Sequence, residues 1–130
     1  MNDTRISIEF EGIGVVEGIL FDNVNPKTYR AVVNKIPFES EANIWGDEIY
    51  FDMPVSASVE NGRKKVEVGD IAFWPPGKAM CLFFGSTPVS QGAEPVAASP
   101  VNVVGKVKKN IELLQKVVNG TKVEVKVARK

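Results

Sequence analysis

The chain has 130 residues, with 16 basic side chains, 16 acidic side chains and no histidine. A chain of this length can bury its own core, so we expect one domain spanning residues 1–130. The lack of histidine excludes Ser-His-Asp and Cys-His nucleophile pairs as well as histidine-ligated zinc.

Alternating apolar and polar residues predict β-strands along most of the chain. In "RISIEFE" the apolar side chains fall on one side, and "KVEVKVARK" near the other end repeats the pattern. We expect about eight strands in all. They include residues 5–11, 14–21, 71–74, 79–84, 101–107 and 123–127.

Two segments show helical spacing instead. In "NPKTYRAVVNKIP", Asn25 is placed to cap a helix that starts at Pro26 and ends before Pro37. In "NIELLQKVVNG", Asn110 is placed to cap a second helix that ends at Gly120. The residues of this second helix that we expect to face inward are Ile111, Leu114 and Val118.

Many short strands with two isolated helices do not alternate as βαβ units do. The pattern predicts a mainly β fold: a closed eight-stranded antiparallel β-barrel capped by two α-helices. Eight strands enclose an interior just wide enough for their own side chains. We therefore expect any binding site on the outer wall of the barrel or in its loops.

The stretch "SEANIWGDEIYFDM" predicts a β-hairpin. A two-residue turn at Gly46-Asp47, with glycine at its first central position, fits the sequence. This turn sets Trp45 opposite Glu48 and Asn43 opposite Tyr50. Ile44 and Ile49 then face the core.

The outer face of this hairpin is expected to carry Asn43, Trp45 and Tyr50. Two interpretations stay open for the aromatic residues: they shield the sheet beneath a loop, or they form a shallow site for an apolar ligand. Glu41 and Asp52 share this face. We interpret them as solvated carboxylates rather than as a catalytic acid–base pair.

The stretch "GDIAFWPPGKAMCLFFG" predicts two apolar strands joined by a Pro-Pro-Gly-Lys turn. Both faces of its second strand are apolar, so the face that does not serve the core needs a cover. A loop, a partner or a ligand would each supply such a cover. Residues 86–100, "STPVSQGAEPVAASP", have neither a helical nor a strand pattern and are expected to form a long loop, which is a candidate for it. Cys81 has no basic neighbour and is interpreted as an inert core residue.

Positive charge is concentrated near the C-terminus. Residues 101–130 contain eight Lys or Arg and two Glu, a difference of +6. Lys106, Lys122 and Lys126 occupy alternate positions of expected strands, which indicates a solvated outer face. We therefore expect no nucleic-acid partner.

The sequence also bears on location and cofactors. No apolar run approaches the ~20 residues of a membrane-spanning helix, and the start lacks the basic-then-apolar order of a secretion signal. A single cysteine cannot form an intramolecular disulfide. We expect a cytoplasmic protein with no membrane partner. We also expect no metal and no cofactor, since no ligand cluster or phosphate loop is present in the sequence.

Several motifs resemble a known family. The tail "VNVVGKVKKNIELLQKVVNG" with "TKVEVKVA" is similar to the end of the cyclophilins, and "AMCLFFG" lies where they have a Ser-Gln-Phe-Phe strand. "IWGDEIYF", "GDIAFWPPGKAMCLFFGSTP" and "ASPVNVVGKV" resemble more closely the prokaryotic cyclophilin-like proteins of uncharacterised function. The resemblance spans essentially the whole chain and implies a fold rather than a reaction.

Resemblance to true cyclophilins would imply prolyl isomerisation, with an apolar proline pocket and an arginine that hydrogen-bonds the twisting amide. Phe83 matches the pocket phenylalanine within one position, whereas Asn43 stands at the best-aligned position for the arginine. Residues 86–100 lack the tryptophan and histidine that the family places there. Loss of one preorganised donor typically lowers a rate by ~10²–10³.

We therefore expect a non-catalytic or vestigial cyclophilin-like protein. It would bind an apolar or proline-containing peptide, or a small molecule, in an outer groove formed by Asn43, Trp45, Tyr50 and Phe83. The alternative is a weak peptidyl-prolyl cis-trans isomerase that acts through Asn43 and the shape of the pocket. A homo-oligomer closed by exposed aromatic residues is a third hypothesis, compatible with either of the others.

Overall fold

The computed structural model describes residues 2–128 and consists of ten antiparallel strands, one α-helix and one 3-10 helix. The strands are β1 (Asp3–Phe10), β2 (Gly14–Phe21), β3 (Phe38–Glu41), β4 (Asn43–Trp45), β5 (Glu48–Asp52), β6 (Arg63–Lys65), β7 (Asp70–Trp74), β8 (Ala79–Phe83), β9 (Val96–Lys109) and β10 (Lys122–Val127). The helices are α1 (Pro26–Val33) and the 3-10 helix η1 (Ile111–Lys116). Among these residues, no helix is long and apolar enough to cross a membrane.

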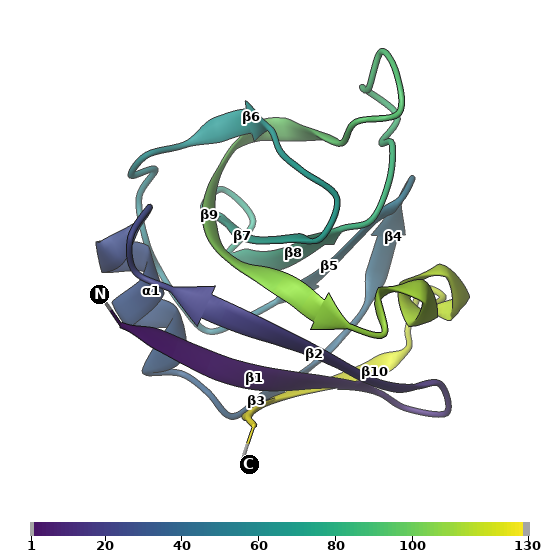
Figure 1. Cartoon of the computed structure of the whole chain (residues 1–130), viewed down its shortest axis with the longest axis horizontal. Coiled ribbons are helices and arrows are strands. Elements are labelled where there is room, and N and C mark those ends of the chain that lie inside the picture. Colours follow the sequence, from purple (N-terminus) through teal and green to yellow (C-terminus); the bar gives the residue numbers. More distant parts are fainter. Residues whose placement is uncertain (1, 129–130) are drawn as a thin grey trace.

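The strands form one curled sheet in the order β3-β10-β1-β2-β9-β7-β8-β5-β4, and β6 pairs with β9 beside this path (Figure 1). The two edge strands, β3 and β4, do not hydrogen-bond to each other as a ladder. The expectation of a closed eight-stranded barrel is therefore not confirmed. The mainly β, antiparallel character is as expected.

The reason lies in residues 38–45. β3 and β4 are successive parts of one segment, interrupted only at Ala42, so they follow each other along the chain and do not pair side by side. The first part pairs with β10 and the second part with β5. At this interruption, the Ala42 N–H donates to the Thr121 carbonyl oxygen, and the Gly120 N–H donates to the Ala42 carbonyl oxygen. The two edge strands are therefore connected only through the chain at Ala42, and no hydrogen-bonded ladder joins them.

The inside of the curled sheet is packed with the protein's own side chains. Alternate residues of each strand face inward, as the period of a strand requires. The largest fully buried side chains of this core include Phe10, Leu20, Ile49, Phe51 and Phe73. As expected from the sequence, the interior is filled by side chains of the protein itself.

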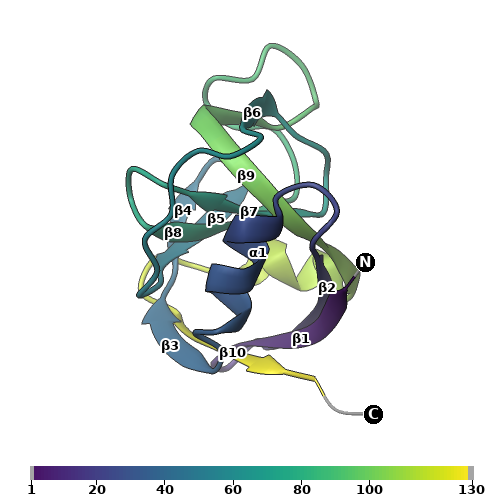
Figure 2. The same ribbon diagram turned by 90° about the vertical axis from the view of Figure 1, so that its left-hand side faces the viewer.

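Helix α1 lies across one end of the sheet (Figure 2). Pro26 begins it as expected, but the Asn25 side chain makes no capping hydrogen bond. The Asn25 amide instead donates to the Val103 carbonyl oxygen, at 2.8 Å. The carboxylate of Glu60, distant in sequence, accepts the N–H groups of Lys27 and Thr28, both at 3.1 Å. Asn25 thus anchors the helix to β9, and Glu60 satisfies its free N–H groups.

The second helix is a 3-10 helix, not the expected α-helix, and Asn110 forms no side-chain cap. It lies at the opposite end of the molecule from α1 (Figure 1). A 3-10 helix repeats every 3.0 residues rather than 3.6, so its buried face follows a spacing of three. Leu114, three residues after Ile111, is buried. The helix ends at Lys116, so Val118, expected to face inward from it, lies beyond its end and is 64% exposed.

Strand β9 begins earlier than expected and turns over the outside of the sheet. Residues 96–100 were expected to lie in a loop but form the start of β9, where they pair with β6 (Figure 1). Small residues such as Ala97, Ala98 and Ser99 give no strand alternation, so only the pairing with β6 reveals the strand. The remaining loop spans residues 86–95.

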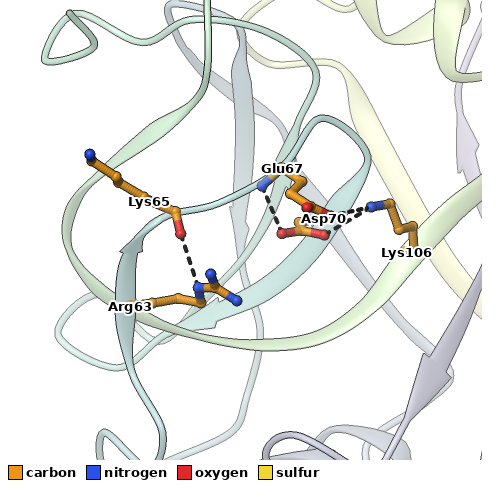
Figure 3. A network of polar contacts seen from close by, with 5 residues as sticks. All are labelled: Arg63, Lys65, Glu67, Asp70 and Lys106. Atoms are coloured by element: carbon orange, nitrogen blue, oxygen red, sulfur yellow. Dashed lines mark hydrogen bonds and ion pairs between the residues drawn. The ribbon is translucent and has the colours of Figure 1, made fainter.

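A polar cluster ties the β6–β7 connection to β9 (Figure 3). Lys106 Nζ lies 2.9 Å from a Glu67 carboxylate oxygen and 3.6 Å from an Asp70 carboxylate oxygen. The Glu67 N–H donates to Asp70 at 2.8 Å, and Arg63 Nε donates to the Lys65 carbonyl oxygen at 3.0 Å. Lys106 therefore pairs with carboxylates of the protein itself. This pairing is compatible with the interpretation of the basic C-terminal part as a solvated outer face.

Candidate functional site

A second apolar cluster lies on the outer face of the sheet. Because both faces of β7 and β8 are apolar, one face joins the inner core and the other needs a cover. The two-faced pattern of "AMCLFF" led us to expect a cover, with residues 86–100 as the candidate. The cover comes from β9, whose residues in the cluster include only Ala97 from that range, and from Val66. The cluster contains Val66, Ala72, Cys81, Phe83, Ala97, Val101 and Val103, with Phe21, Tyr50 and Trp74 packed against it.

At the edge of this cluster lies a small hollow, which we call the outer pocket. Its lining residues are Trp45, Glu48, Tyr50, Trp74, Ala97, Ala98 and Val101. They come from β4, β5, β7 and β9. The cavity volume is about 70 Å³. Since one water molecule has a share of ~30 Å³ in the liquid, the outer pocket accepts a group of only a few non-hydrogen atoms.

The hairpin that carries two of the aromatic residues has the register expected from the sequence. Trp45 pairs with Glu48 and Asn43 with Tyr50. Gly46 adopts a φ of 60°, and a Cβ there would lie 2.8 Å from an atom of the 86–95 loop. The Asp47 N–H also donates to the Ser86 carbonyl oxygen at 2.9 Å. The turn is thus docked on the loop, which fixes the position of this wall.

The opposite aromatic wall is fixed as well. The Trp74 indole N–H donates to Ser99 Oγ at 2.7 Å, which ties β7 to the overlying part of β9. A Cβ at Gly77 would lie 2.5 Å from the Trp74 ring, so the turn after β7 packs directly on the indole. The outer pocket is therefore largely preformed, as small-molecule sites usually are.

Glu48 is the one ionisable carboxylate among the lining residues, and it is only 6% exposed. Burial raises the pKa of Glu48 to about 7, and a hydrogen bond with the Cys81 thiol lowers it in part. Burial, with Glu48 as a neighbour, raises the pKa of Cys81 well above its ordinary value, so this thiol is a poor nucleophile. No Lys or Arg lines the outer pocket, and Glu48 forms no ion pair within residues 2–128.

The structure brings together two of the four residues proposed from the sequence. Trp45 and Tyr50 both line the outer pocket and are partly exposed. Phe83 lies beneath the outer face with no exposed surface, so it supports the outer pocket without lining it. Asn43 is exposed and lies outside the lining, with its amide 3.4 Å from the Tyr50 carbonyl oxygen.

Sequence reasoning missed Glu48 and Trp74. The hairpin register already placed Glu48 opposite Trp45, so its side chain belongs to the aromatic face. Its burial depends on β9 turning over that face, which no local pattern indicates. Trp74 follows from alternation in "DIAFW", but the contact partner that directs its ring, Ser99, lies 25 residues away.

A larger surface depression lies across β1, β10 and β3. Its lining residues are Glu9, Glu11, Glu39, Ser40, Glu41, Lys122, Val123 and Glu124, and its volume is about 480 Å³. Most of these carboxylates are exposed to solvent. Within residues 2–128, no group of three or more His, Cys, Asp or Glu is placed to hold a metal ion. Size alone therefore does not make this depression a better candidate than the outer pocket.

Comparison with known proteins agrees with the fold. Residues 4–126 match the family model described as Cyclophilin-like. The solution structure of the hypothetical protein AF2241 from Archaeoglobus fulgidus is similar, with 43% sequence identity and a TM-score of 0.83. The match covers 97% of this chain and 95% of that one. No curated protein matches the chain.

Proposed function

Since the chain belongs to the cyclophilin-like family, we propose that it is a non-catalytic binding protein that holds a small, mainly apolar group in the outer pocket. This group would be part of a peptide or of a small molecule. The observation that carries the proposal is the preformed aromatic lining of Trp45, Tyr50 and Trp74. These three rings lie on a face of the sheet that the inner core cannot use.

The dimensions of the outer pocket limit its occupant. Ligand sites for drug-sized molecules have volumes of ~300–1,000 Å³, several times the 70 Å³ found here. A whole cofactor would not fit, whereas one side chain of a peptide or the head of a small molecule would. The aromatic rings supply apolar contact area to such a group, and the alanine side chains of β9 leave room for it.

Weak prolyl isomerisation receives less support. A proline ring needs exposed apolar surface at Phe83, yet this side chain is fully buried. The amide of Asn43 lies outside the outer pocket and contacts the hairpin's own backbone at Tyr50. The two residues that would replace the cyclophilin machinery therefore do not meet at one site.

Ligand titration followed by NMR tests the binding proposal. We would titrate the ¹⁵N-labelled chain with a fragment library and with Xaa-Pro peptides. We expect shifts to cluster at the indole N–H signals of Trp45 and Trp74 and at the amides of Tyr50 and Ala97. Trp45→Ala should weaken binding by about tenfold, the loss of ~1.4 kcal/mol of ring contacts. Val118→Ala is the matched control, because it removes exposed apolar surface elsewhere.

If no probe moves the signals of the outer pocket, the binding proposal is wrong. A protease-coupled isomerisation assay separates the alternative. An isomerisation rate equal to the uncatalysed rate would exclude the isomerase alternative. Turnover that falls on Asn43→Ala, with Trp45→Ala unaffected, would favour the isomerase over the binding protein.

A further inference from the structure

The outer pocket combines a buried carboxylate with aromatic walls. Aromatic walls alone would hold an apolar group, so the carboxylate needs a separate explanation. Glu48 has only 6% of its surface exposed. It reaches the outer pocket beside the rings of Trp45, Tyr50 and Trp74. We propose that the outer pocket recognises an alkylammonium group, with Glu48 as counter-ion and the three rings as its walls. This inference rests on the proposed binding function and names the class of its ligand.

The first argument is charge. A buried carboxylate is costly unless it is paired, and proteins usually supply an Arg, a Lys or several donors. Here the neighbour is the Cys81 thiol, a weak donor. The outer pocket has no cationic lining residue. A ligand cation would provide the opposite charge that the lining of the outer pocket lacks, and an opposite charge within ~4–6 Å favours the ionised form of a carboxylate.

The second argument is the nature of the walls. Cations bind over the faces of aromatic rings, tryptophan best of all, and clusters of such rings are used to recognise methylated ammonium groups. Two of the three rings here are tryptophans. The remaining lining residues, Ala97, Ala98 and Val101, are small and apolar. They suit the methyl or methylene groups of an alkylammonium better than a strongly hydrated inorganic cation.

The third argument is size and rigidity. A volume of about 70 Å³ fits a head group of a few non-hydrogen atoms with the rest of the ligand outside. The Trp74 indole is held by Ser99, and the Trp45–Glu48 pair is held by the docked turn. A preformed arrangement loses little conformational entropy when the ligand binds.

A matched pair of probes tests the inference. Choline and 3,3-dimethylbutan-1-ol have the same shape, but only choline carries a charge. We would titrate each into the full chain and follow the indole N–H signals of Trp45 and Trp74 by NMR. We expect millimolar binding of choline and a dissociation constant for the alcohol at least about tenfold higher, a difference of ~1.4 kcal/mol.

Glu48→Gln keeps the shape of the side chain and removes its charge. It should abolish the preference for choline and leave the alcohol's affinity within about twofold. Glu41→Gln is the control, because Glu41 is an exposed carboxylate outside the outer pocket. A second variant, Trp45→Leu, should reduce choline binding several-fold even with Glu48 intact. The affinity for a short peptide that carries trimethyl-lysine, compared with the affinity for choline, shows whether the ammonium group belongs to a peptide or to a free small molecule.

Equal affinity for choline and the alcohol would overturn the inference while leaving an apolar binding function intact. A choline preference that survives Glu48→Gln would also overturn it. Failure of both probes, together with failure of the fragment library, would remove the ligand class and the binding function together.

Discussion

The buried carboxylate of Glu48 makes stability depend on pH in a direction that can be calculated. The pKa of Glu48 is about 7 in the folded chain against an ordinary value of 4.5. The folded state therefore holds this proton more tightly than the unfolded state. Below pH 4.5 both states are protonated and no penalty arises. As the pH rises from 4.5 through 7, the folded chain is destabilised, because the unfolded state ionises first.

The size of the effect follows from the two pKa values. Their difference of about 2.5, at ~1.4 kcal/mol per pKa unit, corresponds to ~3 kcal/mol. This is an upper limit, because water entering the outer pocket screens the charge. Glu48→Gln removes the titration, so the variant should become more stable than the wild type by up to this amount between pH 5 and 8.

Urea denaturation at a series of pH values measures the difference directly. With a typical dependence of ~1–3 kcal/mol per molar urea, the midpoint of Glu48→Gln should exceed that of the wild type by roughly 1–3 M at pH 8. At pH 4.5 the two midpoints should nearly coincide. Glu41→Gln should show no such divergence. A difference between wild type and Glu48→Gln that stays constant from pH 4.5 to 8 would refute the reasoning.

Three further predictions concern the fold around the site and are tested by urea or thermal denaturation. Gly46→Ala should cost more than Gly12→Ala: both positions have left-handed φ angles, worth ~1–2 kcal/mol, but only at Gly46 would the added Cβ meet neighbouring atoms. Equal losses would mean that the turn is not docked on the loop. Phe83→Ala should cost ~3–5 kcal/mol because the ring is fully buried, whereas Asn43→Ala should change the free energy of unfolding by less than ~0.5 kcal/mol. A mild effect at Phe83 would show that it is exposed after all. Glu60→Ala should cost ~1 kcal/mol, since its carboxylate takes the place of a helix cap, and an unchanged free energy of unfolding would argue against this contact.

The site was only partly predictable. The hairpin register followed from the turn glycine and from strand alternation, which are both local, and it placed Trp45 and Tyr50 on one face. Phe83 was assigned to the site because it matches the pocket phenylalanine of the cyclophilins within one position, in a strand that is apolar on both faces. Which of two apolar faces stays open to a ligand depends on the path of distant chain, and β9 closes over Phe83 while leaving the aromatic edge accessible.

Helix ends show the same limit on a smaller scale. Asn25 has the right identity and position for a cap, but its amide is used to hold β9. The carboxylate that accepts the helix N–H groups comes from Glu60, 33 residues from Lys27. Local propensity predicts where helix α1 begins, whereas the partner that satisfies its first turn is set by tertiary packing.

The sequence by itself determined the class of the fold, the positions of most strands, the first helix and the hairpin register. Each of these depends on a short repeat of apolar residues or on a turn residue within a few positions. Only the tertiary structure decided that β3 and β4 do not pair to close the sheet, that η1 is a 3-10 helix and that Glu48 is buried. These features arise from contacts between segments far apart in the chain, and burial of a charge depends on everything that surrounds it.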